Sequence, residues 1–282
     1  MWRVGFFFHE VAFGLLSVFI PLYVVSFQDA SILGGPLVAL GIMSSAAILC
    51  TIPASFFWGY ICDKTRRYKI FILLSFLSSA VILFLLTLSF AQNILAFVIL
   101  YVIMQVLHSA HEAPKNVLIA EHYSRNEWES SYALYEGLTE IGFVIGLVIG
   151  LFAFASTLSF GVIATYTLYL CSALSVAAFI FSVFLIADPL IIFERRLVGI
   201  EKKIGFACNG VEAANRLWHG LQPDGSFKQD RFSTFALAIV LFSLATSIFF
   251  TPLPIVLSHG MGLEPSMVYV AYILNSIGAT LG

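Results

Sequence analysis

Charged side chains are scarce in this sequence of 282 residues: Asp, Glu, Lys and Arg together make up 11% of it. That is less than half of the share of about 25% found in ordinary soluble domains. Hydrophobic residues make up 60%, and the mean hydropathy is +0.97. A water-soluble fold of this length cannot bury so much apolar surface, because every folded protein keeps a large accessible surface. The composition excludes a soluble globular protein and predicts one whose surroundings are the lipid bilayer.

Cysteine and an excess of basic charge are also lacking. The formal net charge is −2, so the chain has no basic signature that would indicate a nucleic-acid partner. The four cysteines show neither a CxxC nor a Cys/His ligand spacing, which excludes a disulfide framework and favours reduced packing residues. These cysteines are Cys50, Cys62, Cys171 and Cys208.

Long hydrophobic runs dominate what is present. About 20 apolar residues are needed to cross roughly 30 Å of hydrocarbon at 1.5 Å per residue. By that rule the sequence predicts eight membrane-spanning helices and an all-α, polytopic fold. The first run is too long for the apolar part of a signal peptide, so we expect an uncleaved span. The runs are residues 4–27, 32–61, 70–90, 94–111, 132–154, 162–187, 232–257 and 266–282.

Basic residues are sorted between the two faces that these spans define. All 14 Lys and Arg residues lie before the first span or in the connections after spans two, four and six. The remaining connections carry only Asp29 and Glu264 as charged residues. The positive-inside rule places the basic connections in the cytoplasm. The pattern predicts a multi-pass protein of the cell membrane with both chain ends on the cytoplasmic side.

The chain also divides into two unequal parts. Residues 1–187 are predicted to form a six-helix bundle, residues 188–231 a cytoplasmic central loop, and residues 232–282 the first two helices of a second bundle. Residues 19–25 (FIPLYVV) are echoed by residues 250–256 (FTPLPIV), each at the outer end of the first span of its half. A parallel repeat of two bundles explains that position. On this logic a complete protein has about 420 residues, and we expect the present chain to be a fragment without the last four helices.

The loop after the second span carries the most specific motif. Residues 59–69 (GYICDKTRRYK) resemble the G-x-x-x-D-[RK]-x-G-[RK]-[RK] signature of the major facilitator superfamily of secondary transporters. The signature is matched at Gly59, Asp63, Lys64 and Arg67. Arg66 stands where the signature has its second glycine. This departure affects the expected tight turn more than the expected charge cluster. The resemblance implies two six-helix bundles that rock to give alternating access. It also implies that these four matching residues form a latch for the outward-open state, with Gly59 allowing close helix approach.

The fifth span carries a stripe of small residues. Gly142, Gly146 and Gly150 recur every four residues and therefore lie on one face of a helix. Such a stripe lets a neighbouring backbone approach closely. Ordinary helix packing is sufficient to explain it.

Ionisable residues at bilayer depth are costly, so each is a functional candidate by default. In the fifth span, Glu136 and Glu140 are one turn apart and lie about 8 and 14 Å past Ser131. Two close carboxylates in a low dielectric tend to share one proton, which is what coupling to a proton gradient needs. The alternative is that they pair with an Arg or His across the bundle.

Spans one, four and eight offer further candidates for the proton or substrate pathway. His9 and Glu10 lie about 9 Å into the first span, and they could equally reach back to water. His108 and Glu112 share a polar face with Gln105 and His111 near the cytoplasmic end of the fourth span. The HxxHE order of that face matches no zinc-peptidase spacing, so no metal site is predicted. In the eighth span Asn275 could line the pathway, together with Tyr269 and Tyr272, or make interhelical contacts.

These observations predict a secondary active transporter that moves a small solute by alternating access, coupled to protons through the acidic residues. No chemical reaction and no cofactor are implied; the expected partners are the solute, protons and the lipid bilayer. Two alternatives remain. A seven-span receptor would place the N-terminus outside and reverse the charge bias. An intramembrane metal-dependent enzyme would use the face formed by His108 and Glu112.

Overall fold

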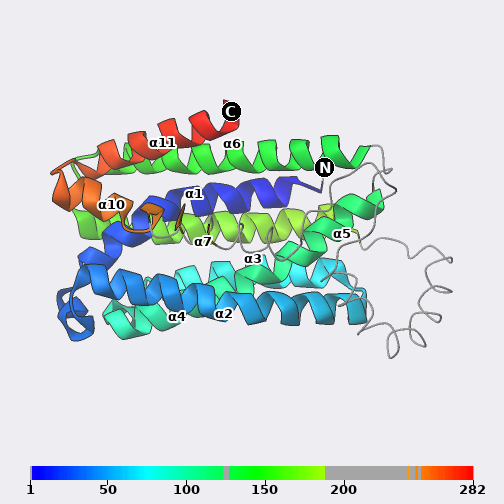
Figure 1. The fold of residues 1–282 in the computed structure, drawn as a ribbon, viewed down its shortest axis with the longest axis horizontal. Helices are drawn as coiled ribbons and strands as arrows, with labels where there is room; N and C mark the ends of the chain where they lie inside the picture. The colour runs from blue at the N-terminus through cyan, green and yellow to red at the C-terminus, as the bar shows by residue number, and fades with distance from the viewer. Residues whose placement is uncertain (1, 123–126, 188–240, 242–244, 247–248, 282) are drawn as a thin grey trace. The chain divides into compact units, whose positions relative to one another are not determined.

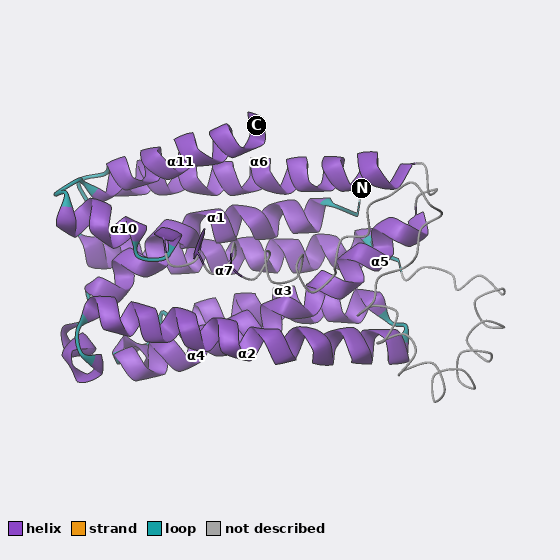
Figure 2. Ribbon diagram, viewed as in Figure 1, coloured by secondary structure: helices purple, strands orange, loops and turns teal. Residues whose placement is uncertain are grey.

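The computed structural model of the chain describes residues 2–122, 127–187, 241, 245–246 and 249–281. Throughout these residues the secondary structure is helical, with short turns and loops between helices, as Figure 2 shows. The predicted central loop, residues 188–231, and most of the predicted seventh span, residues 232–257, lie outside the described residues. The all-α fold expected from the composition is confirmed.

Among the described residues, six helices are long and apolar enough to cross a membrane. Each overlaps one of the first six predicted spans, so the protein is a multi-pass membrane protein. A further helix, α11, overlaps the predicted eighth span, and short helical segments lie between the spans. The bounds are α1 Val4–Val25, α2 Pro36–Thr65, α3 Tyr68–Leu85, α4 Ile94–His108, α5 Glu112–His122, α6 Trp128–Phe154, α7 Phe160–Leu185, α10 Leu253–Ile255 and α11 Pro265–Leu281.

The second span begins later than its hydropathy suggests. Residues 28–33 form a 3₁₀ turn, and the chain then reverses through Gly34 and Gly35, whose φ angles are 90° and 108°. Pro36 occupies the first helical position, where its missing N–H costs no hydrogen bond. Glycine is needed here because side-chain-bearing residues rarely adopt a positive φ.

Residues Met1–Asp188 and Thr251–Gly282 make up one compact unit, and Pro189–Phe250 make up another. Within the first unit α1 packs against both α6 and α7. α3 contacts α7 and α4, α2 lies along α4, and α11 runs beside α6, as can be followed in Figure 1. α1 is the most buried of the six candidate spans: 67% of its most apolar stretch is buried inside the protein. The first span is therefore the central element of its unit.

The glycine stripe of α6 lies against the backbone of α1. A β-carbon at Gly146 would collide with the Val11 carbonyl, and one at Gly14 would collide with the Phe143 carbonyl. Gly150 faces the ring of Tyr269 on α11 instead. The close backbone approach predicted from the stripe is confirmed, and glycines on both helices make it possible.

Polar contacts tie helix ends together on both sides of the unit. Asp29, in the turn before α2, accepts a hydrogen bond from the backbone N–H of Ile94 at 3.0 Å, at the N-terminus of α4. At the other ends of the helices, Lys69 Nζ donates to the Val183 carbonyl at 2.6 Å in the last turn of α7. An acid at a helix N-terminus and a cation at a helix C-terminus both complement the helix dipole.

The loop of the family signature forms a tight turn without the second glycine. Arg66 ends α2 in the left-handed region, with φ 56° and ψ 28°, and its N–H donates to the Cys62 carbonyl at 2.8 Å. The expected close approach at Gly59 is not seen among the described residues. A β-carbon there would meet no described atom within 4 Å, because that part of α2 is largely exposed.

Large apolar side chains cover much of the outer surface of the spans. Leu49 is 69% exposed, Phe56 78% and Phe184 81%. A water-soluble protein rarely presents such contiguous apolar surface, whereas hydrocarbon chains solvate it well. The exposed apolar surface agrees with the composition and places these helices in a lipid environment.

Candidate functional site

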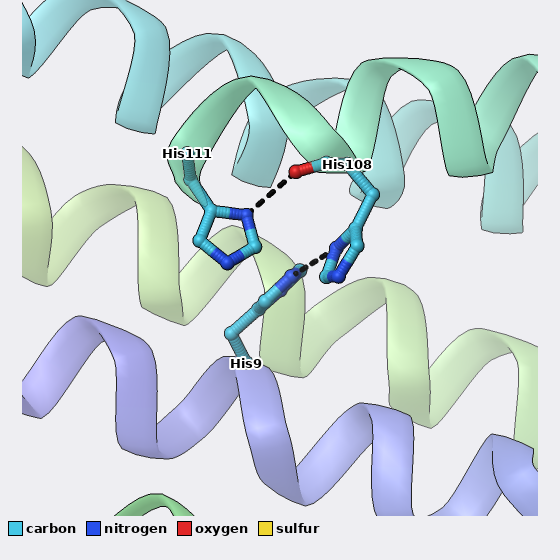
Figure 3. A group of neighbouring side chains, drawn as sticks. All are labelled: His9, His108 and His111. Atoms are coloured by element: carbon cyan, nitrogen blue, oxygen red, sulfur yellow. Dashed lines mark hydrogen bonds between the residues drawn. The ribbon is translucent and has the colours of Figure 1, made fainter. Parts of the chain in front are cut away.

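Three histidines meet inside the unit, from two parts of the chain. His9 comes from α1, His108 is the last residue of α4, and His111 ends the 3₁₀ turn that joins α4 to α5. His9 Nε2 and His108 Nδ1 are hydrogen-bonded at 3.0 Å across 99 residues of sequence. Figure 3 shows the three rings facing one another. One nitrogen from each ring lies within 4.8 Å of those of the other two.

The His111 ring is oriented by backbone and hydroxyl groups. Its Nδ1 lies 2.6 Å from the His108 carbonyl oxygen, which can only accept, so Nδ1 carries a proton. The Ser75 hydroxyl on α3 donates to the same carbonyl at 3.0 Å and lies 3.1 Å from Nδ1. This arrangement leaves Nε2 of a neutral His111 with a free lone pair.

Aromatic rings enclose the histidines. The His9 ring lies 4.4 Å from that of Phe76 and 4.7 Å from that of Phe13, and Phe13 stacks on His108 at 4.2 Å, between ring centroids. His9 is fully buried, and its Nδ1 has no hydrogen-bond partner in the described structure. Such an unsatisfied buried nitrogen is uncommon and needs an explanation.

Glu112 lies at the edge of this cluster rather than inside it. Its side chain is 49% exposed, and its two oxygens contact His111 Nε2 at 3.2 Å and Lys115 Nζ at 2.7 Å. The ion pair with Lys115 spans one helical turn, and only its Glu112 end is well exposed, because the Lys115 side chain is 13% exposed. Glu10, on α1, is half-buried and within electrostatic range of His111, Glu112, Lys115 and Glu136.

The two glutamates of α6 occupy a different surface. Both Glu136 and Glu140 are exposed in the described structure. Glu140 Oε2 accepts a hydrogen bond from Ser276 Oγ on α11 at 3.0 Å. The alternative considered from the sequence was an Arg or His partner across the bundle. The partner of Glu140 that the described structure shows is a serine hydroxyl, and it comes from the part of the chain predicted to begin the second bundle.

The three candidate residues of α11 do not share one environment. Tyr269 is fully buried, and its hydroxyl donates to the Leu15 carbonyl of α1 at 3.1 Å, so it packs the helices together rather than lining an open surface. Tyr272 is partly buried. Asn275 is exposed, whereas Ser276, the next residue, is buried.

The charged members of the signature lie at the exposed end of α2. Asp63, Lys64 and Arg67 are all exposed, and Lys64 Nζ lies 5.8 Å from the centre of the Tyr60 ring. A latch partner for them is not among the contacts of the described residues, and the latch stays a prediction.

Sequence reasoning missed several of the residues that complete these sites. Ser75 and Ser276 are small polar residues within apolar helices, and nothing in their spacing distinguishes them from packing serines. Lys69 lies in the basic loop after the second span, and nothing in the sequence indicates that it caps α7. His9 was paired in sequence with Glu10, yet in space its ring belongs with His108 and His111.

Comparisons with known proteins agree with this architecture. The Major Facilitator Superfamily profile matches residues 4–282. Over 149 residues the chain is 34% identical to the multidrug resistance protein MdtG of Rahnella sp. (strain Y9602), and equally so to the proteins of that name from Escherichia fergusonii and Salmonella arizonae. The aligned stretch is 52% of this chain and 34% of each relative's length.

The family match separates the functional alternatives. It covers nearly the whole chain, including the helices that carry the histidines and the acidic residues. It indicates a transporter rather than an enzyme, and it does not favour a receptor. With its helical fold, its apolar spans and the signature loop after α2, this chain belongs to the Major Facilitator Superfamily.

Proposed function

We propose that this protein is a proton-coupled secondary transporter of small organic solutes, and that Glu140, with Glu136, is the group that gains and loses the proton. The observation that carries the proposal is the hydrogen bond between Glu140 and Ser276. It joins α6, in the first predicted bundle, to α11, in the second. Any motion of one bundle against the other therefore changes the surroundings of this carboxylate.

The coupling follows from this position. When the bundles separate on one side, Glu140 loses the hydroxyl of Ser276 and must be solvated by water or neutralised by a proton. When they close, Glu140 leaves water, and its charge is then supported only by the hydrogen bond from Ser276, because burying a charged carboxylate in a low dielectric is costly. Glu136, one turn away, adds a second negative charge and favours the sharing of a proton. The protonation state thereby biases which arrangement of the bundles is stable.

The charges near the pathway also favour a class of solute. Glu10, Glu136 and Glu140 supply negative charge from α1 and α6, whereas the Lys and Arg residues of the described spans lie at helix ends. Cationic or neutral organic molecules are thus the preferred substrates on electrostatic grounds. The relatives are named multidrug resistance proteins, which supports export of such molecules.

Orientation is part of the same proposal. The contact between Arg3 Nη2 and the Ser131 carbonyl, at 3.5 Å, brings the basic N-terminus to the start of α6. Lys69 reaches the end of α7. Arg3 and Lys69 thus lie at connections that alternate threading brings to one side of the membrane, and the positive-inside rule makes that side cytoplasmic.

The test is transport by the full-length protein in proteoliposomes, with and without an imposed pH gradient, using a labelled lipophilic organic cation. We expect accumulation of the cation by the wild type only with the gradient. Glu140→Gln should lose gradient-driven accumulation while keeping solute exchange at equal pH. Glu264→Gln, a change in an exposed loop acid, is the matched control and should behave as the wild type. Equal accumulation without a gradient, or full gradient-driven accumulation by Glu140→Gln, contradicts the proposal.

A further inference from the structure

The histidine cluster is not needed for the transport proposal, and it has the features of a metal site. We propose that His9, His108 and His111 bind one divalent transition-metal ion of the zinc type. Imidazole nitrogen is a preferred ligand for such ions, and three histidines with a fourth position for water or a carboxylate is a recurrent zinc arrangement.

The distances between ring nitrogens are near those that a metal needs. Two nitrogens bound to tetrahedral zinc at 2.0–2.1 Å lie about 3.3 Å apart. His9 Nε2 and His108 Nδ1 are already 3.0 Å apart. The 4.8 Å limit on the three ligand nitrogens exceeds the tetrahedral separation by about 1.5 Å, which small rotations of the rings can close.

His111 has the supporting contacts of a metal ligand. In metal sites the ring nitrogen that does not bind the metal usually donates to a backbone carbonyl or a carboxylate, which sets the tautomer. Here Nδ1–H of His111 donates to the His108 carbonyl and faces Ser75 Oγ, which leaves the Nε2 lone pair available. That Nε2 lies 3.2 Å from Glu112 Oε1, a contact that a proton on Nε2 makes in the metal-free protein. A metal ion that replaces this proton would have Glu112 near its fourth position.

The burial of His9 also bears on the site. The ring is fully buried among Phe13, Phe76 and the other two histidines, and its Nδ1 has no hydrogen-bond partner in the described structure. Burying this polar atom costs roughly 1–3 kcal/mol. A metal ion bound through Nε2 leaves Nδ1 unpaired, but the bond that the same ring makes to the metal offsets the cost of burying it.

Sequence order explains why the site is not visible as a motif. His108 and His111 provide two ligands from one turn of chain, and that spacing alone matches no zinc enzyme. The third ligand comes from α1, 99 residues before His108. A bound ion would therefore join α1 to the α4–α5 connection inside the first bundle.

The test is direct metal binding by the full-length protein, purified in detergent without a polyhistidine tag and stripped with a chelator. Cobalt(II) is titrated first, because its visible d–d absorption reports tetrahedral coordination, and zinc is then used to displace it. We expect one ion per chain by elemental analysis. The cobalt spectrum should lack the intense thiolate charge-transfer band that Cys50 or another cysteine would produce.

Variants assign the ligands. His9→Phe and His108→Gln should each weaken zinc binding by about 100-fold or more, because each removes one of three protein ligands. His259→Ala, which changes an exposed histidine outside the cluster, should bind as the wild type. His9→Gln serves as a second change at the buried position should His9→Phe fail to fold, with elution as a single species in gel filtration as the criterion.

The outcomes that overturn the proposal are clear. Wild-type protein that binds no stoichiometric zinc or cobalt, or folded His9 and His108 variants that bind as the wild type, show that the cluster is packing only. Binding that disappears after cysteine alkylation assigns the metal to thiols instead. None of these readouts involves transport, so failure here leaves the role of Glu140 untouched, and loss of coupling in Glu140→Gln leaves the metal site untouched.

Discussion

Ser276 Oγ donates a hydrogen bond to Glu140 Oε2 at 3.0 Å, across 136 residues of sequence. The contact joins α11 to α6, which run side by side in Figure 1. Hydrogen bonds to a charged acceptor contribute more than neutral ones, about 1.5–3 kcal/mol. Glu140 thus has a structural role in holding the two helices together as well as the proposed role in coupling.

That role predicts a measurable coupling between the two residues. Ser276→Ala and Glu140→Ala, made separately and together, should give a coupling free energy of about 1 kcal/mol in thermal or chemical unfolding of the detergent-purified protein. Asn275→Ala, one residue earlier and exposed, should couple to Glu140→Ala by less than about 0.5 kcal/mol. Additive effects of Ser276→Ala and Glu140→Ala would show that the hydrogen bond does not stabilise the folded protein.

The contact between α1 and α6 predicts a strong effect of one methyl group. In Gly146→Ala the new β-carbon collides with the Val11 carbonyl, and backbone atoms cannot move aside without separating the helices. We expect destabilisation of about 1–3 kcal/mol, seen as a lower melting temperature in detergent. Gly137→Ala is the matched control on the same helix, because its β-carbon would meet nothing within 4 Å. It should be neutral or slightly stabilising, since alanine is the better helix former. Equal stability of the two variants would contradict the close packing.

The turn after α2 predicts a stabilising substitution. Arg66 adopts a left-handed conformation that costs a residue with a side chain roughly 1–2 kcal/mol, whereas glycine adopts it freely. Arg66→Gly should therefore raise the free energy of unfolding by about 1 kcal/mol. Thr65→Gly, one residue earlier in the last turn of the helix, should lower it by a similar amount, because glycine there adds chain entropy and removes the hydrogen bond from Thr65 Oγ1 to the Ile61 carbonyl. Melting curves of both variants in the same detergent check this. A loss of stability in Arg66→Gly would mean that the arginine side chain makes contacts that outweigh the backbone strain.

Much of the fold was accessible from the sequence alone. The first six spans, found from apolar runs, overlap α1, α2, α3, α4, α6 and α7 because a helix in lipid must satisfy every backbone hydrogen bond within itself and present apolar side chains to hydrocarbon. The stripe that includes Gly142 and Gly146 predicted close helix approach, because helical periodicity puts such residues on one face. The boundaries were less accessible: the second apolar run begins at residue 32, whereas the helix begins only at Pro36, after the 3₁₀ turn of residues 28–33 and the backbone reversal at Gly34 and Gly35.

Contacts between distant residues needed the tertiary structure. The sequence placed His9 beside Glu10 and His108 beside Glu112, because neighbours along the chain are all that a pattern records. Packing of α1 within its unit turns the His9 ring toward His108 and leaves Glu112 at the surface with Lys115. In the same way Ser276 became the partner of Glu140 only through the packing of α11 on α6.

By itself, the sequence determined that this chain threads a membrane repeatedly and where its first six spans lie, because the cost of transferring side chains and backbone into lipid is additive and local. Its resemblance to the superfamily followed from one loop of consecutive residues. Tertiary structure alone decided which polar side chains meet, since each such meeting depends on the relative rotation and depth of two helices that no single segment encodes. Only the tertiary structure shows that His9 lies beside His111 and that Tyr269 packs against Gly150. It also shows that the turn at Arg66 is left-handed.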